Sequence, residues 1–436
     1  RCRSTTPLKG SMFVATPASQ SCQTLDDWLC YIEQSHPVHQ IELGLERVQS
    51  VASRAGLQSL PGNSLLMGGT IGIGTTGRAL EQLLLAQGYT VGVYSSPHLL
   101  HFNERLRVDN TDLSDADWVD AFAFVEQLRG DIGLTYFEFT TLVAFRILQL
   151  KQPDFCLIEV GLGGRLDATN IISPDISVIT TVDLDHQDWL GNDRESIGFE
   201  KSGIFRQGQP IVIGELNPPA SVLKQADRLN CKVKQVTKHY RYGEEANSWY
   251  WHSDIASYSQ LPLPAMPVQN AACALAVLEI LNLLPQPSDL SAVLAGVTLP
   301  GRMQWLQQQP AIIADVAHNP QSAGYLAEQL RKLKPQYRQI YALCGMLKDK
   351  DIQQTLLPLT PLFNQWHLVS LSGARGASAQ QLADALAGAL TGAQLYNDVQ
   401  QAYRAIRANL QPDELLVVFG SFFTVSAVLA DHLEAK

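Results

Sequence analysis

Short, almost wholly apolar segments alternate along the chain with longer stretches whose apolar residues recur at helical spacing. Four apolar segments lie in the first half, at residues 65–67, 91–94, 156–160 and 176–181. Between the first two, Leu80, Leu83 and Leu84 fall on one face of a predicted helix that ends at Gly88. Strands that are apolar on both faces and separated by helices are typical of a parallel sheet with helices on both sides.

The same alternation begins again after Pro300-Gly-Arg302. Strands are predicted at residues 312–315, 340–344 and 415–419, with helices after Pro320 and after Ser421. We therefore expect an α/β protein with an N-terminal parallel-sheet domain over residues 12–299 and a smaller C-terminal α/β domain over residues 300–436. Residues 1–11, before Met12, resemble an expression remnant and are expected to lie outside the fold.

Residues 231–262 follow a different pattern, because large aromatic residues alternate with polar ones, as in antiparallel strands. The aromatic residues are Tyr240, Tyr242, Trp249, Tyr250, Trp251 and Tyr258. The simpler interpretation is a small antiparallel sheet at the edge of the N-terminal domain. A platform for stacked nucleic-acid bases is the alternative, but it would need a regular interleaving of Lys and Arg that we do not find.

Composition narrows the class of protein further. The chain has 436 residues, of which 46% are hydrophobic and 17% charged, and its net charge is −10. This is globular rather than disordered composition. An acidic balance without a basic block argues against nucleic-acid and membrane-surface partners, and no apolar run reaches the roughly 18–20 residues of a membrane helix. The seven scattered cysteines contain no C-x-x-C pair, so we expect reduced thiols and a cytoplasmic location.

A glycine-rich run, Gly68-Gly-Thr-Ile-Gly-Ile-Gly-Thr-Thr-Gly77, lies between the first predicted strand and the helix that follows it. Glycines there let backbone N–H groups close around phosphate oxygens, and the helix N-terminus adds favourable charge. The run also fits G-x-G-x-x-G, the dinucleotide fingerprint, which needs an acid at the end of the next strand. That strand ends in Ser95-Ser96, and the first acid afterwards is Glu104. A phosphate site is therefore favoured over a purely structural turn, and an NAD-dependent oxidoreductase is the weakest interpretation.

Three predicted strands end in side chains suited to a hard cation, namely Ser96, Glu159 and His186. Ligands of open α/β sheets lie at the carboxyl ends of the strands, so these residues should converge on the glycine-rich run. A hydroxyl, a carboxylate and an imidazole could hold Mg²⁺ against nucleotide phosphates. Each residue taken singly is more simply explained as structural. Lys201 is ambiguous in the same way, because most lone lysines are solvated surface groups.

Eight longer motifs occur in a fixed order along the chain. They are Leu43-Gly-Leu-Glu-Arg47, Tyr94-Ser-Ser-Pro-His-Leu99, Leu134-Thr-Tyr-Phe-Glu138, Glu159-Val-Gly-Leu-Gly-Gly-Arg-Leu-Asp-Ala-Thr-Asn170, Leu184-Asp-His186, Glu200-Lys-Ser-Gly-Ile-Phe205, Pro300-Gly-Arg302 and Asp315-Val-Ala-His-Asn-Pro320. In these motifs the chain resembles the bacterial dihydrofolate synthase/folylpolyglutamate synthase family, part of the Mur ligase superfamily. The resemblance covers nearly everything after Met12.

The resemblance implies a P-loop-type ATPase domain with a small antiparallel edge sheet, followed by a Rossmann-like ligase domain. ATP would lie on the glycine-rich loop and be contacted from a following helix and from the C-terminal domain. The residues implied are Thr70, Ile71, Gly72, Ile73, Gly74, Thr75, Asn270, Arg302 and Asp315.

Metal and substrate residues are implied by the same resemblance. Ser96, Glu159 and His186 match Mg²⁺ ligands of the family, and Lys201 matches a lysine that is often carbamylated and can then help to bind a second Mg²⁺. The pterin-bearing substrate would lie against Glu42, Leu43, Gly44, Leu45, Thr135, Tyr136, Phe137, Glu138, Leu166, Asp167 and Ala168. Glu42 stands where relatives often carry Asp.

The glycine-rich loop departs from the family pattern at two positions. The family loop is Gly-Thr-Asn-Gly-Lys-Gly, whereas this chain has Ile71 in place of Asn and Ile73 in place of the phosphate-binding Lys. That Lys acts as a point charge on the β- and γ-phosphates, which isoleucine cannot do, and a β-branched residue is awkward in a tight turn. Three explanations compete: a misassigned segment, an altered variant and a natural pseudoenzyme. Because every other motif is intact, a local anomaly is favoured.

The activity that the resemblance implies is ATP-dependent amide ligation through an acyl phosphate. Its substrates would be L-glutamate with dihydropteroate or a reduced folate, and charge neutralisation and positioning would supply most of the catalysis. His318 would orient nucleotide or glutamate, or else cap a helix. Domain closure would assemble the site, and we expect a monomer with small-molecule partners only. The alternative function is a nucleotide- or folate-binding relative disarmed at Ile73.

Overall fold

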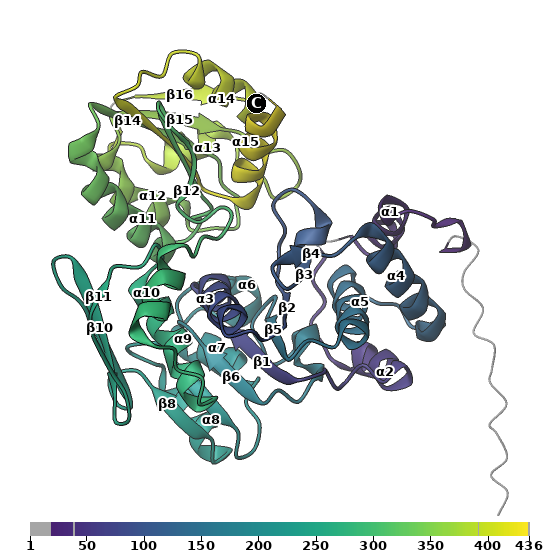
Figure 1. Cartoon of the computed structure of the whole chain (residues 1–436). Helices are drawn as coiled ribbons and strands as arrows, with labels where there is room; N and C mark the ends of the chain where they lie inside the picture. Colours follow the sequence, from purple (N-terminus) through teal and green to yellow (C-terminus); the bar gives the residue numbers. More distant parts are fainter. Residues whose placement is uncertain (1–18, 38–39, 391, 435–436) are drawn as a thin grey trace, which may run out of the picture.

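The computed structural model describes residues 19–37, 40–390 and 392–434. The expectation for residues 1–11 therefore lies outside the described residues. Two α/β units are stacked one above the other, the N-terminal one carrying the small antiparallel sheet at its side (Figure 1). Within the described ranges, every helix falls short of the length and apolarity that a bilayer span requires.

An eight-stranded sheet forms the centre of the N-terminal unit. Six neighbouring strands run parallel, and β3 and β4 continue the sheet as an antiparallel hairpin at one edge. In spatial order the strands are β4 (Thr111–Asp112), β3 (Leu106–Val108), β2 (Val91–Tyr94), β5 (Phe155–Glu159), β1 (Asn63–Gly68), β6 (Ile176–Ile179), β7 (Pro210–Ile213) and β8 (Lys232–Gln235).

Helices cover both faces of this sheet because successive strand residues point to opposite sides. Leu66 and Ile158 join one apolar cluster, whereas Leu65 and Leu157 join the other. On the first face lie α1 (Leu25–Ser35), α2 (Glu46–Ala55), α4 (Asp115–Arg129), α5 (Tyr136–Lys151), α7 (Arg194–Ser202) and α8 (Ala220–Arg228). On the second lie α3 (Ile73–Ala86), α9 (Val268–Ile280) and α10 (Pro287–Ala295).

The small antiparallel sheet consists of β9 (Tyr240–Glu244), β10 (Ser248–Ser253) and β11 (Ser257–Pro262). The prediction of an edge sheet is correct for these strands but wrong for residues 232–235, which pair parallel with β7 in the large sheet. Tyr240, Trp249, Trp251 and Tyr258 are buried in the apolar cluster shared with α9. Rings buried in a core cannot stack on nucleic-acid bases, so the platform interpretation has no support.

The C-terminal unit is built on a six-stranded sheet. Five strands run parallel and β12 is antiparallel at one edge. The spatial order is β12 (Gln304–Gln308), β13 (Ala311–Asp315), β17 (Glu414–Phe419), β14 (Gln339–Cys344), β15 (Gln365–Val369) and β16 (Ala393–Tyr396). Helices α11 (Pro320–Leu333), α12 (Ile352–Leu356) and α13 (Ala379–Ala385) cover one face, and α14 (Val399–Arg407) and α15 (Phe422–Glu434) cover the other.

The expected fold class is confirmed: a large, mainly parallel sheet domain precedes a second α/β sheet domain. The predicted strands coincide with β1, β2, β5, β6, β13, β14 and β17 to within a few residues.

Candidate active site

The glycine-rich loop connects β1 to α3 and is held from below by two threonines at the end of β6. Thr181 Oγ1 accepts the N–H of Ile71 at 3.0 Å, and Thr180 Oγ1 donates to the Ile71 carbonyl at 2.7 Å. Thr70 exchanges hydrogen bonds with the backbone of Asp183, at 2.9 and 3.1 Å. Backbone and threonine contacts thus fix the loop, whatever the side chain at position 71.

Ile73 is the first residue of α3 and not part of the turn. The tight conformation falls on Gly72, whose φ is +81°, so the expected steric conflict for a β-branched residue does not arise. The Ile73 side chain lies back over the loop, where a Cβ on Gly69 would come within 3.2 Å of Ile73 Cγ1. Its remaining surface packs against the cluster between α3 and α9. The apolar Ile73 side chain therefore stands where the side chain of the family's lysine would begin.

Glu159 and Ser96 lie together at the ends of β5 and β2. The Ser96 N–H donates to the Glu159 carboxylate, and both carboxylate oxygens would lie 4.0 Å from a Cβ on Gly74. Burial raises the pKa of Glu159 to about 7, against the opposing charges of Arg302 and Arg107. Arg107 forms its ion pair with the buried Glu81, at 2.7 Å, and not with Glu159. A desolvated carboxylate beside a phosphate loop, with a hydroxyl next to it, suits a divalent cation.

His186 follows β6 and lines a different pocket from Ser96 and Glu159. Burial and the charge of Lys350 lower the pKa of His186 to about 4, so the ring is neutral and can act as a ligand. Among the described residues, no three His, Cys, Asp or Glu side chains form a ready metal cluster. The structure thus joins Ser96 to Glu159 in the cleft beside the loop, whereas His186 lines the pocket between the two units. His186 is tied to the loop through the chain, because Asp183, three residues before it, hydrogen bonds to Thr70.

Lys201 is buried, which excludes the solvated surface interpretation. Its Nζ donates to the carbonyl of Gly69 at 2.6 Å, directly under the glycine-rich loop. Burial lowers the pKa of Lys201 to about 8, only partly opposed by Asp185 and Asp167. A neutral fraction at physiological pH is what reaction with CO₂ requires.

Two of the predicted nucleotide residues, Asn270 and Arg302, reach the loop region from outside the main sheet, and Asp315 supports the second of them. Asn270 in α9 packs on the loop, because a Cβ on Gly72 would lie 2.5 Å from its Oδ1. Arg302 lines a cleft with Gly74, Ser96 and Glu159, and its guanidinium lies 5.4 Å from the ring of Phe422. The Asp315 carboxylate accepts the N–H groups of Met303 and Ala317 at 2.8 Å each, which fixes the segment that carries Arg302.

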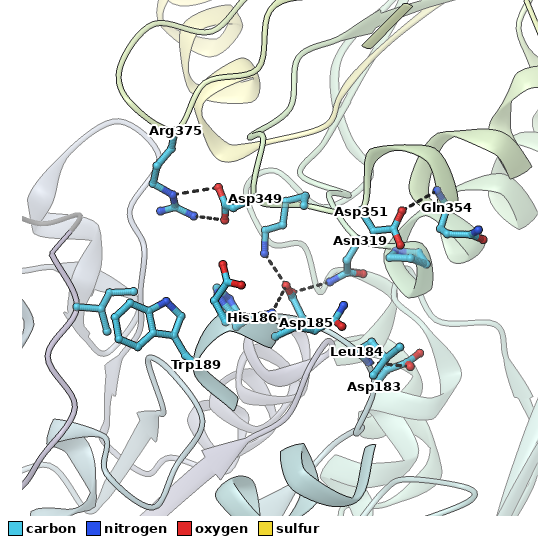
Figure 2. Close-up of a pocket in the computed structure, with 15 residues that line it drawn as sticks. Asp183, Leu184, Asp185, His186, Trp189, Asn319, Asp349, Asp351, Gln354 and Arg375 are labelled. Carbon is cyan, nitrogen blue, oxygen red and sulfur yellow. Dashed lines mark hydrogen bonds and ion pairs between the residues drawn. The ribbon is translucent and has the colours of Figure 1, made fainter. Parts of the chain in front are cut away.

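A polar pocket of about 520 Å³ lies between the two units, beside His186. At its centre Asp185 pairs with Lys350 at 2.6 Å and accepts Asn319 Nδ2 at 3.0 Å (Figure 2). Burial alone would raise the pKa of Asp185, but the neighbouring His318 ring and the charge of Lys350 hold that pKa well below its usual range. The cluster therefore stays ionised and ties the C-terminal unit to the loop after β6.

Sequence reasoning missed Lys350 and Arg375 in this pocket. Arg375 pairs with Asp349 at 2.7 Å on the wall near Trp189. The local signal was the charged run Lys348-Asp-Lys-Asp351, which begins four residues after the end of strand β14. The helix-cap interpretation of His318 is wrong, because Asn319 is the residue that caps α11. His318 Nδ1 contacts the Val316 carbonyl at 2.8 Å, and Nε2 lies 3.7 Å from Asp185.

The three segments predicted for the pterin meet on the α2–α5 face of the sheet. Both α2 and α5 contact the short 3₁₀ helix η3 (Ala168–Ile171). Arg47 bridges Glu42 and Glu138 at 3.1 Å each. The Phe137 ring covers Gly161, where any Cβ would lie 2.5 Å from Phe137 Cζ. Asp167 accepts the N–H groups of Leu162 and Thr169, so its loop is rigid.

Thr135 has a structural role that can be measured. Its hydroxyl accepts the N–H of Glu138, and the Glu138 carboxylate accepts the N–H of Thr135 at 2.8 Å, a capping box for α5. We expect Thr135→Ala to lower the free energy of unfolding by about 1 kcal/mol in urea titrations, and Thr135→Ser to retain it. Equal stability of the two variants would contradict the capping role.

Comparison with known proteins places this geometry in context. Residues 301–422 match the Mur ligase glutamate ligase domain family. Over 410 residues the chain is 41% identical to dihydrofolate synthase/folylpolyglutamate synthase of Escherichia coli (strain K12), covering 94% of this chain and 96% of the relative. The corresponding Haemophilus influenzae protein is 41% identical over 422 residues, covering 92% and 96%.

Solved structures give the same result. E. coli FolC in complex with DHPP and ADP aligns with a TM-score of 0.90 at 41% identity, over 96% of this chain and 99% of that one. A bifunctional folylpolyglutamate synthase/dihydrofolate synthase with Mn, AMPPNP and L-glutamate bound aligns with a TM-score of 0.87 at 44% identity, over 95% and 99%. Since sequence and fold agree over nearly the whole length, the chain belongs to the dihydrofolate synthase/folylpolyglutamate synthase family of ligases.

Proposed function

We propose that the protein joins L-glutamate to dihydropteroate, giving dihydrofolate, and to reduced folates, giving folylpolyglutamate, at the expense of ATP. The observation that carries this proposal is the meeting of the α3 N-terminus, the Ser96–Glu159 pair and Arg302 in one cleft. The relatives that bind ADP, AMPPNP, Mn and L-glutamate support it. The comparisons give no support to the alternative of an impaired relative.

The reaction proceeds in two steps. The substrate carboxylate attacks the γ-phosphorus of ATP in line, which forms an acyl phosphate and releases ADP. The amine of glutamate then attacks the acyl carbon, loses a proton and displaces inorganic phosphate. Carboxylates are poor acyl donors because oxide is a poor leaving group, and phosphorylation supplies a better one.

The residues of the chain act mainly by position and charge. N–H groups at the start of α3 and the guanidinium of Arg302 face the transferred phosphate. Ser96, Glu159 and His186 would hold Mg²⁺, which supplies charge neutralisation on the phosphates. The carbamate of Lys201 would help to bind a second Mg²⁺. Asn270 and Asp315 would fix the nucleoside, and His318 would orient glutamate or nucleotide beside Asp185.

The remaining assignments belong to the same proposal. The pterin lies against the segments around Leu43, Thr135 and Asp167. The domains divide near residue 300, and the protein acts as a monomer in the cytoplasm without nucleic-acid or membrane partners. Glu104 does not support NAD chemistry, because its carboxylate is already occupied by the N–H groups of Leu99, Leu100 and His101.

The proposal is tested by measuring ADP release from purified protein. We expect release only when glutamate is present together with dihydropteroate or tetrahydrofolate. Release with a UDP-muramyl substrate instead would move the protein to the cell-wall branch of the superfamily. No release under any of these conditions, from protein whose loop sequence has been verified, would overturn the proposal.

Carbamylation of Lys201 has a direct spectroscopic test. The neutral amine adds to CO₂ and loses one proton, which leaves an anionic carbamate under the glycine-rich loop. We expect a carbamate carbon signal in NMR spectra of protein incubated with ¹³C-bicarbonate, stronger at pH 8 than at pH 6 because the pKa of Lys201 is lowered to about 8. The Lys201→Met variant should lack the signal, and its persistence there would assign it to another lysine.

A further inference from the structure

The segment that follows β2 crosses from the N-terminal unit to the C-terminal one. It carries Ser96 and then Leu99, which is buried in an apolar cluster whose other buried members all belong to the C-terminal unit. Ser426 of α15 donates to the Leu99 carbonyl at 2.6 Å. In Figure 1, α15 lies above the blue segment around β3 and β4. A hydrophobic side chain three residues from a predicted metal ligand is thus seated in the other domain.

Gly301 lies on the other side of the Leu99 side chain. Its φ is +69°, and a Cβ there would come within 3.1 Å of Leu99 Cδ1 and 3.0 Å of Val316 Cγ1. Only glycine therefore allows the Leu99 side chain to lie against the segment that leads into Arg302. Leu99 thus touches the chain directly before Arg302, and Ser96 and Arg302 line the same cleft.

The connection between Ser96 and Leu99 is stiff. The Glu104 carboxylate accepts the N–H groups of Leu99 at 2.7 Å, Leu100 at 2.8 Å and His101 at 2.7 Å. Arg105 donates to His98 Nδ1 at 2.9 Å, and its carbonyl accepts the N–H of Ser95. Because these bonds link residues 95–105 into one unit, we expect a displacement of Leu99 to shift Ser96 with it.

We propose that Leu99 is a positioning residue through which docking of the C-terminal domain sets the metal-binding loop. When Leu99 is seated between Gly301 and α15, Ser96 stands beside Glu159 and faces the same cleft as Arg302. When Leu99 is displaced, the segment shifts as a unit, Ser96 moves away from Glu159 and the divalent cation is held less tightly. This inference rests on the proposed function, because it concerns the metal–nucleotide site of that reaction.

The test compares Leu99→Ala with Leu113→Ala, a matched cavity variant. Leu113 is similarly buried, but it packs within the N-terminal core. Mn²⁺ binding in the presence of AMPPNP, followed by the EPR signal of free Mn²⁺, needs no turnover. We expect about tenfold weaker Mn²⁺ binding for Leu99→Ala and unchanged binding for Leu113→Ala. Small-angle scattering with AMPPNP and Mn²⁺ should give a larger radius of gyration for Leu99→Ala only.

Two further variants guard against a simple folding defect. Leu99→Met keeps the volume of the side chain and should restore Mn²⁺ binding, whereas Ser426→Ala removes the donor to the Leu99 carbonyl and should weaken it in the same direction. Equal Mn²⁺ affinity in Leu99→Ala, Ser426→Ala and the parent protein would overturn the inference. Absence of glutamate-dependent ADP release from the parent protein would instead count against the proposed function, whatever Leu99 does.

Discussion

Replacing Ile73 by lysine is expected to raise kcat/KM for ATP by about 100-fold. Position 73 is the first of α3, and its side chain already lies back over Gly69 at the mouth of the phosphate loop. A lysine that starts along this path places an ammonium beside the β- and γ-phosphates, where charge develops during transfer. Initial rates of ADP release over a range of ATP concentrations, with glutamate and dihydropteroate saturating, measure the change.

The matched control is Ile73→Met, which has comparable length and no charge. If the gain comes from charge, Ile73→Met should stay at the parental kcat/KM. Because Ile73 also packs against the α3–α9 cluster, the lysine should lower the free energy of unfolding by about 1 kcal/mol while activity rises. Equal kinetics for the methionine and lysine variants would contradict an electrostatic role for this position.

Glu159→Gln is expected to lower kcat by about 1,000-fold and to abolish its dependence on Mg²⁺ in the millimolar range. The amide keeps the shape of the side chain and can still accept the Ser96 N–H, so only the charge that a cation needs is lost. The measurement is a titration of ADP release with Mg²⁺ at fixed ATP. The corresponding Asp112→Asn variant, at the outer rim of the same cleft, should keep parental kinetics.

Stability provides an independent signature for Glu159. Its folded pKa of about 7 lies above the ordinary value of 4.5, so the folded state binds more protons between those two values. Stability of the metal-free protein must therefore fall as the pH rises from 4.5 to 7, and stays reduced above that. At pH 8 without metal, Glu159→Gln should be more stable than the parent by about 3 kcal/mol in urea titrations. A variant that is both inactive and less stable would point to misfolding instead.

Local patterns in the sequence were sufficient for most of the sheet framework. The strands β1, β5 and β17 are buried on both faces, so their residue composition alone marks them. Residues 232–235 were placed in the wrong sheet because Lys232 and Lys234 make an edge strand look solvated and alternating. Lys234 in fact pairs with buried Glu279 across to α9.

The sequence predicted a site residue wherever a single motif contains both the reactive side chain and the strand or helix end that positions it. Glu159 and Lys201 stand in long motifs at strand or helix ends, and the structure brings both to the glycine-rich loop. Contacts between segments that are far apart in the sequence leave no recognisable pattern in either segment. Asp185 and Lys350 are 165 residues apart, and Leu99 and Ser426 are 327 apart. Only the folded chain shows that these pairs join the two domains beside the site.

The threonine pair under the loop has a consequence for how this protein can change. Thr180 and Thr181 hydrogen bond to the main chain of Ile71. The glycine-rich loop therefore keeps its conformation whichever side chains it carries. Substitutions at positions 71 and 73 therefore change the rate of turnover much more than they change the stability of the fold. A lineage could lose nucleotide turnover and regain it through single-codon steps while the scaffold persisted unchanged.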